Sequence, residues 1–131
     1  MGAMSTLHAL LHAPEFRRHW RALLLALLFT VTWLALTPNP PQNPLEQGDK
    51  FDHLLAFGTL AVVAVFTGAP GRRRAATAAA GLLLYGGLIE IVQTQLPPRS
   101  GEWLDLLADA VGIALGLAAA TLLRRLRPPH H

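Results

Sequence analysis

Four long apolar runs limit what this chain can fold into. They cover residues 20–38, 50–70, 75–96 and 103–123. A helix needs about 20 apolar residues, with about 17–25 observed, to cross the hydrocarbon core of a bilayer. Of the 131 residues, 52% are apolar and only 15% are charged. The sequence therefore predicts an all-α, polytopic membrane protein, a bundle of four transmembrane helices joined by short loops.

The two ends of the chain are expected to lie outside the bundle. Residues 1–19 are interpreted as a tag remnant followed by a short cytoplasmic segment, and residues 128–131 as a tail with a tag remnant. The transmembrane domain is thus expected over residues 20–127. The chain has no cysteine, which excludes a disulfide, a thiolate nucleophile and a Cys-ligated metal.

The basic residues predict how the bundle is oriented. Nine of the 11 Lys and Arg residues fall on one side of the predicted bundle: Arg17, Arg18, Arg21, Arg72, Arg73, Arg74, Arg124, Arg125 and Arg127. Because cytoplasmic loops carry an excess of Lys and Arg, we expect both termini in the cytoplasm. Membrane lipid is then the expected neighbour of these clusters, and a nucleic-acid partner is not expected.

The acidic residues gather on the opposite, outer side of the predicted bundle. Seven of the eight lie there: Glu46, Asp49, Asp52, Glu90, Glu102, Asp105 and Asp109. At 1.5 Å per residue, Glu90 and Asp109 lie about 9 Å from the outer ends of their runs, and His53 about 6 Å from its own. A carboxylate at the centre of a bilayer costs about 2.5–3.5 kcal/mol, so such residues are functional candidates. We expect them to form a polar pocket.

Spacing within the runs places these groups on shared helix faces. Three pairs are three or four residues apart: Asp49 with His53, Glu90 with Gln93, and Asp105 with Asp109. Lys50 and Arg99 are the two basic residues on the same side. The predicted ligand-binding set is therefore Asp49, Lys50, His53, Glu90, Gln93, Arg99, Asp105 and Asp109, with His53 and Glu90 as candidates for catalysis.

The fourth run also carries small residues at a spacing of four: Ala108, Gly112, Gly116 and Ala120. In membranes such a face allows another helix to approach closely. It predicts tight packing within the bundle, and it also offers a surface for a homodimer or a larger membrane partner.

Three segments occur in a fixed order, "DKFDHLLAF", "EIVQ" and "RSGEWLDLLADAVGIALG". They resemble the VanZ-like family of small bacterial membrane proteins, whose namesake accompanies resistance to the glycopeptide teicoplanin. The resemblance covers about residues 38–116 and implies a role in the cell envelope. The family's polar positions correspond to Asp49, Lys50, His53, Glu90, Gln93, Arg99, Asp105 and Gly112. Many members have Asn where this chain has Asp109, so the extra carboxylate changes the charge of the pocket.

Three functions stay open at this point. The pocket could bind a lipid-linked or phosphate-bearing envelope molecule, with Arg99 holding a phosphate through paired hydrogen bonds. Alternatively, His53 and Glu90 could serve as general acid and base, or hold a divalent metal together with Asp105, Asp109 or both. The spacing of these residues matches no established metal motif, and no specific cofactor is predicted. The third alternative is an accessory subunit that docks a larger envelope protein.

Overall fold

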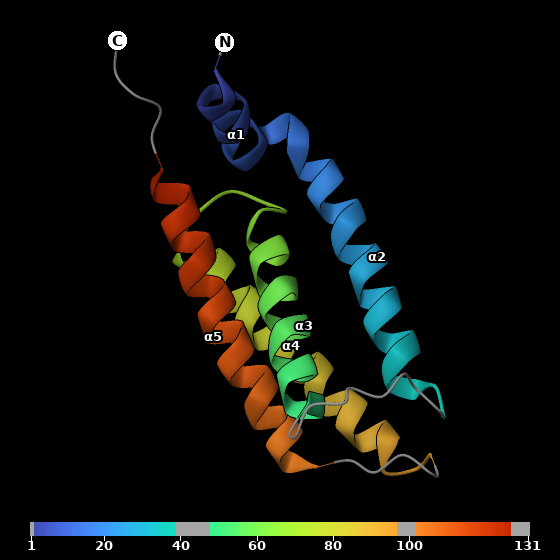
Figure 1. Cartoon of the computed structure of the whole chain (residues 1–131). Coiled ribbons are helices and arrows are strands. Elements are labelled where there is room, and N and C mark those ends of the chain that lie inside the picture. Colours follow the sequence, from blue (N-terminus) through green and yellow to red (C-terminus); the bar gives the residue numbers. More distant parts are fainter. Residues whose placement is uncertain (1, 39–47, 97–101, 127–131) are drawn as a thin grey trace.

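The computed structural model describes residues 2–38, 48–96 and 102–126, and the regular structure in these ranges is entirely helical. The elements are α1 (Ala3–His12), the 3-10 turn η1 (Pro14–Phe16), α2 (Arg17–Leu36), α3 (Gly48–Val65), α4 (Arg72–Gln93) and α5 (Trp103–Arg125). Figure 1 shows α2 to α5 side by side, with α1 at one end. The prediction of an all-α chain is confirmed.

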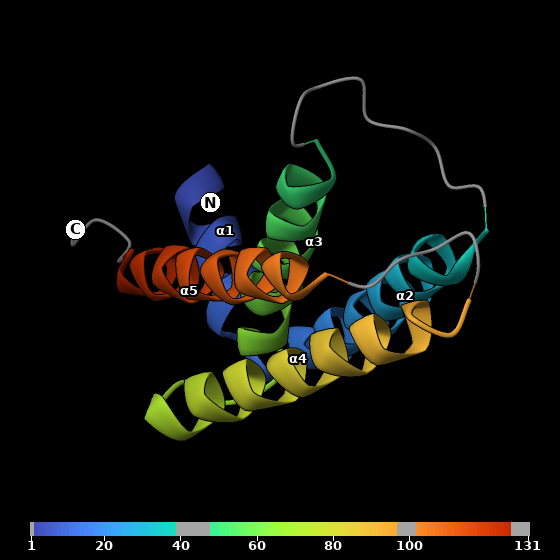
Figure 2. The ribbon, with the colours of Figure 1, turned by 90° about the horizontal axis from the view of Figure 1, so that it is seen from below.

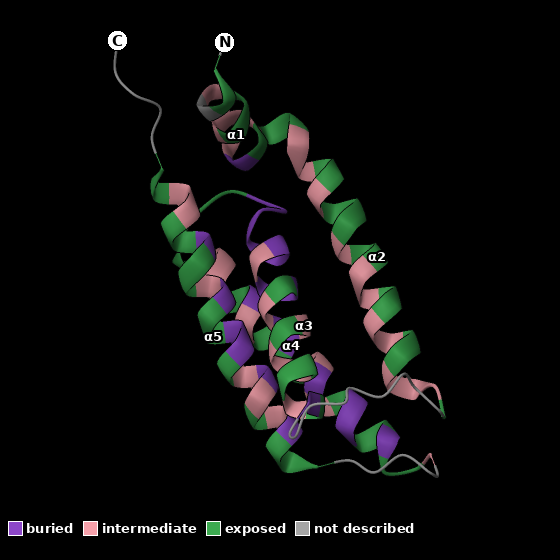
Figure 3. Ribbon diagram, in the orientation of Figure 1, coloured by how far each residue is buried: buried purple, intermediate pink, exposed green. Residues whose placement is uncertain are grey.

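Three helices are long and apolar enough to cross a membrane: Pro14–Leu36, Arg72–Gln93 and Trp103–Arg125. The first of these exposes large apolar side chains along its length, including Leu25, Phe29 and Trp33. None of the residues of α2 is buried, and Figure 3 shows no buried position on this helix. A helix that exposes an apolar surface of this extent fits lipid as its surroundings better than water. The chain is a membrane protein.

The helix α3 differs from these three because its first turn is charged and its second half is buried. Asp49, Lys50 and Asp52 lie in its first five residues, whereas Phe57 and Leu60 are almost fully covered. It packs most extensively against α5 and also contacts α2 and α4. In Figure 2, α3 crosses α5, and α2 and α4 run side by side next to them. The contacts of α3 with α2, α4 and α5 place it at the centre of the bundle.

Small residues allow α3 and α5 to approach closely. A Cβ atom added to Gly112 would overlap the backbone carbonyl of Leu54, and one added to Gly116 would overlap that of Gly58. The small-residue face of α5 therefore packs on α3 of the same chain, as expected for such faces. A homodimer or larger partner on this face would have to displace α3, and docking of a second protein there stays a prediction.

Two of the predicted helix ends lie too far along the chain. The second run was expected to continue to residue 70, but α3 ends at Val65, where backbone N–H groups of Phe66 and Thr67 bond three residues back. Similarly, α4 ends at Gln93 and a turn follows through Leu96. Phe66 continues the apolar run past the end of α3, and Leu96 lies just past the end of α4, so composition alone does not mark where the regular hydrogen bonds stop.

The N-terminal segment folds back onto the bundle. Leu11 of α1 is buried against Val65, Phe66 and Ala120. Trp20 donates a hydrogen bond from Nε1 to the carbonyl oxygen of Leu10 at 2.9 Å, and its ring lies 5.0 Å from that of Phe66. These contacts are mainly apolar packing, and they join α1 to the end of α5.

Candidate functional site

The charged residues of α3, α4 and α5 meet at one end of the bundle, where α3 and α5 begin and α4 ends (Figure 1). His53 of α3 lies with Nδ1 2.8 Å from Oδ1 of Asp109 on α5. Its other ring nitrogen, Nε2, lies 3.6 Å from Oδ2 of Asp105. Because Asp105 and Asp109 are one helical turn apart, both reach the same imidazole.

Lys50 forms a second group beside the first. Its ammonium lies 2.7 Å from Asp49, 2.7 Å from Glu102 and 2.6 Å from Asp105. All three contacts are ion pairs, and those with Asp49 and Glu102 are also hydrogen bonds. Asp49 precedes the predicted span, and the hydrogen bond from Lys50 lowers the pKa of its carboxyl below the usual value. The ammonium has three donors, and three carboxylates surround it.

Glu90 and Gln93 of α4 point to different neighbouring elements. Oε2 of Glu90 accepts a hydrogen bond from the backbone N–H of Glu102 at 2.8 Å, which connects the end of α4 to the start of α5. Gln93 donates from Nε2 to the carbonyl oxygen of Ala35 at 2.8 Å and therefore faces α2. Gln93 therefore joins α4 to α2 at this end of the bundle, on a different side from His53.

Several oxygens of the site are buried without a hydrogen-bond donor among the described residues. They include Oε1 of Glu90 and Oδ2 of Asp109. Asp109 is only 1% exposed and Glu90 8%. Gly86 makes room for this arrangement, since a Cβ atom there would lie 2.7 Å from Oδ2 of Asp109 and 3.2 Å from the ring of Phe57. Buried polar atoms normally have a partner, so these two oxygens identify the part of the site where one is missing.

Two groups of side chains have the composition of a metal site. His53, Glu90 and Asp109 each offer a ligand atom within 4.8 Å of the others, and so do Asp49, Glu102 and Asp105. The second group already surrounds the ammonium of Lys50, whereas the first has no lysine or arginine paired with it in the described part of the chain. The first group is therefore the one whose two buried carboxyl groups have no lysine or arginine beside them among the described residues.

The structure brings together six of the eight predicted site residues: Asp49, Lys50, His53, Glu90, Asp105 and Asp109. Gln93 faces α2 instead, and Arg99 lies outside the described residues. Glu102 was expected on the same side of the bundle but was not among the predicted site residues. It lies three residues before Asp105, and this spacing was the available signal that both carboxylates would meet the same partner.

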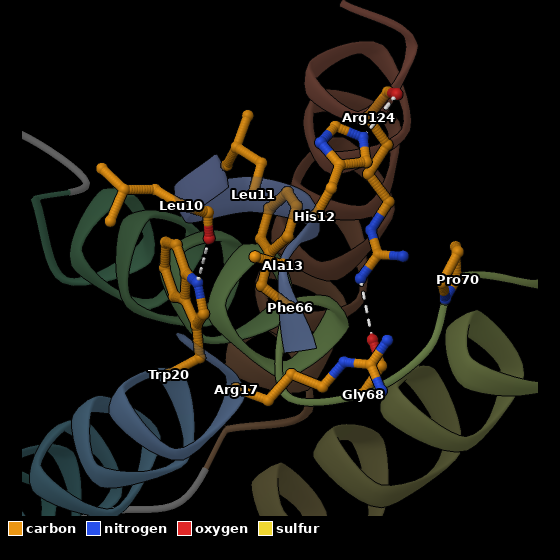
Figure 4. Close-up of a pocket in the computed structure, with 10 residues that line it drawn as sticks. All are labelled: Leu10, Leu11, His12, Ala13, Arg17, Trp20, Phe66, Gly68, Pro70 and Arg124. Carbon is orange, nitrogen blue, oxygen red and sulfur yellow. Dashed lines mark hydrogen bonds between the residues drawn. The ribbon is translucent and has the colours of Figure 1, made fainter. Parts of the chain in front are cut away.

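A separate cavity lies at the opposite end of the bundle, between α1, α2 and the end of α5 (Figure 4). It contains about 310 Å³ of space not filled by atoms, and its lining includes Arg17, Trp20, Phe66 and Arg124. Arg124 donates to the backbone carbonyls of Val65 at 2.8 Å and Gly68 at 3.0 Å, which fixes it over the end of α3. This cavity is basic and apolar, and it shares no residue with the acidic site.

Comparison with known proteins gives one result that covers most of the chain. The family model described as VanZ/LLP1 matches residues 8–124. No curated protein and no solved structure matches the sequence significantly. The matched range includes all the described helices except the start of α1 and the last residue of α5, and it contains the whole acidic site. The resemblance seen in the sequence is confirmed: the chain belongs to the VanZ/LLP1 family.

Proposed function

We propose that the protein crosses a bacterial inner membrane four times, with both termini in the cytoplasm and the acidic site towards the periplasm. Three helices meet the length and hydropathy of a span, and α3 lies among them. The arginines at the start of α2, at the start of α4 and at the end of α5 support the orientation, since such clusters favour the cytoplasmic side.

Cysteine accessibility tests this topology without any background labelling, because the chain has no cysteine of its own. In intact spheroplasts, a membrane-impermeant maleimide should label Gln42→Cys, between the first two spans. The variants Ser5→Cys and Arg73→Cys should react only after the membrane is permeabilised. Labelling of Arg73→Cys in intact spheroplasts would show that the protein has the opposite orientation to the one proposed.

The proposed function is to bind the headgroup of a lipid-linked or phosphate-bearing envelope molecule, in envelope maintenance or glycopeptide resistance. The observation that carries this proposal is the set of charged side chains from three helices that meet inside an apolar bundle. His53 contacts Asp109, and Lys50 contacts Asp105, whose side chain is only 9% exposed. Intramembrane ionisable groups are costly, and they commonly mark a substrate or ion site.

Charge limits how such a molecule can bind. Lys50 is already paired with the carboxylates of Asp49, Glu102 and Asp105, which balance its charge and leave it a poor partner for a phosphate. The remaining described members of the site are His53 and carboxylates, which would repel an anion. A phosphate therefore needs either Arg99, the other basic residue on this side, or a bound cation as its direct partner.

Native mass spectrometry of the protein released gently from its membrane tests this function. The wild type should carry an envelope lipid with a phosphate, and Glu90→Gln should lose most of it. The substitution removes a buried charge at nearly constant volume, so the helices should stay packed.

The matched control for this test is Glu15→Gln, an exposed carboxylate at the other end of the bundle. It should retain the lipid at the wild-type level. If wild type, Glu90→Gln and Glu15→Gln carry the same lipids and are equally stable, the polar site is not the binding site for them.

A further inference from the structure

We propose that His53, Glu90 and Asp109 bind one divalent metal ion of the Zn²⁺ or Mn²⁺ class. The residues come from α3, α4 and α5, so the ion would join the three helices at their charged end. One imidazole with two carboxylates is a donor set that suits these ions better than soft metals. The part this ion plays towards a phosphate rests on the proposed function, whereas the binding of the ion itself does not.

The geometry is close to that of a loaded site. Donors at about 2.0–2.2 Å from one metal ion lie about 3.0–3.5 Å from each other. Nδ1 of His53 and Oδ1 of Asp109 are already 2.8 Å apart, and the whole set lies within 4.8 Å. A small rotation of the Glu90 side chain would complete the set, because only one of its oxygens is held, by the N–H of Glu102.

The unpartnered oxygens point to a cation independently of this spacing. Oδ2 of Asp109 and Oε1 of Glu90 have no hydrogen-bond donor among the described residues, and both side chains are more than nine-tenths buried. With both carboxylates ionised, the group would carry a net negative charge even if His53 were protonated. Buried charges in proteins are normally paired or coordinate a metal. A divalent ion would satisfy both oxygens and balance the charge.

The neighbouring carboxylates are not expected to compete for this ion. Asp49, Glu102 and Asp105 surround the ammonium of Lys50 at 2.6–2.7 Å, which already balances part of their charge. Three protein donors on Zn²⁺ also leave a coordination position open to water or substrate. A phosphate oxygen could take that position, which would explain how an acidic site accepts an anionic headgroup.

Metal binding should be measured on the full chain in detergent, after washing with a chelator and without added lipid. Titration with Mn²⁺, followed by electron paramagnetic resonance, should show one bound ion per chain, and Zn²⁺ should displace it. Asp109→Asn and Glu90→Gln should each weaken Mn²⁺ binding by about 100-fold. Loss of a residue that only hydrogen-bonds to a metal ligand already costs about 10- to 100-fold in affinity. Glu102→Gln, in the neighbouring group, should bind as the wild type does.

Gly86→Ala gives a test that keeps all three donors. The added Cβ atom would crowd Oδ2 of Asp109 and should weaken Mn²⁺ binding, while Gly87→Ala, where a Cβ atom meets nothing within 4 Å, should not. The proposal is overturned if folded wild-type protein binds no Mn²⁺ or Zn²⁺, or if Asp109→Asn and Glu90→Gln bind them as the wild type does. Metal binding without any co-purified lipid would contradict only the proposed function, because the two are measured in separate samples.

Discussion

Gly112→Val should lower the free energy of unfolding by about 3 kcal/mol, at the upper end of what overpacking of a helix interface costs. The Cβ atom of any larger residue at this position would overlap the carbonyl oxygen of Leu54, and the carbonyl carbon and Cα of Leu54 lie 3.1 Å from the same point. These are backbone atoms, so no rotamer change can relieve the overlap. The whole of α3 would have to move away from α5.

This loss can be measured as a shift of the unfolding transition in detergent, with sodium dodecyl sulfate as the denaturant and circular dichroism as the signal. Gly87→Val is the matched control because a Cβ atom at Gly87 meets nothing within 4 Å. It should unfold at about the same denaturant concentration as the wild type. Equal stability of the two variants would show that α3 and α5 are not packed at this distance.

The same interface shows how much of the fold the sequence could predict. A spacing of four between Gly112 and Gly116 predicts a close helix neighbour, and the structure places α3 there. The pattern could not identify the neighbour, since a small-residue face accepts a helix of the same chain or of another. Likewise, the mean hydropathy of the second apolar run does not show that α3 begins with charged residues and ends in a turn after Val65.

The acidic site was predictable in depth but not in pairing. Helical rise places His53, Glu90 and Asp109 at one level, and the structure brings their ligand atoms within 4.8 Å. Which carboxylate meets which cation depends on how each helix is rotated about its axis, and spacing within one helix does not determine that rotation. For this reason the ring of carboxylates around Lys50 and the turn of Gln93 towards Ala35 were not predicted.

Lys50→Met should destabilise the protein at neutral pH by about 2–3 kcal/mol. This loss is somewhat smaller than that of one partner of a fully buried ion pair, because the side chains of Asp49 and Glu102 are at least half exposed. Asp105 accounts for most of this loss, because its side chain is only 9% exposed and its charge would be left buried without a partner. Without the ammonium, ligand atoms of the three carboxylates remain within 4.8 Å of one another with no positive charge among them.

The effect of Lys50→Met should depend on pH with a defined sign. Mutual repulsion makes the folded variant bind protons more tightly than the unfolded chain, so lowering the pH should stabilise it relative to the wild type. The difference in melting temperature between variant and wild type should therefore shrink from pH 8 to pH 5, while Lys50→Arg should keep near wild-type stability throughout. A difference that stays constant over this range would show that Lys50 contributes through packing of its alkyl chain, and that the carboxylates around it do not repel one another enough to affect folding.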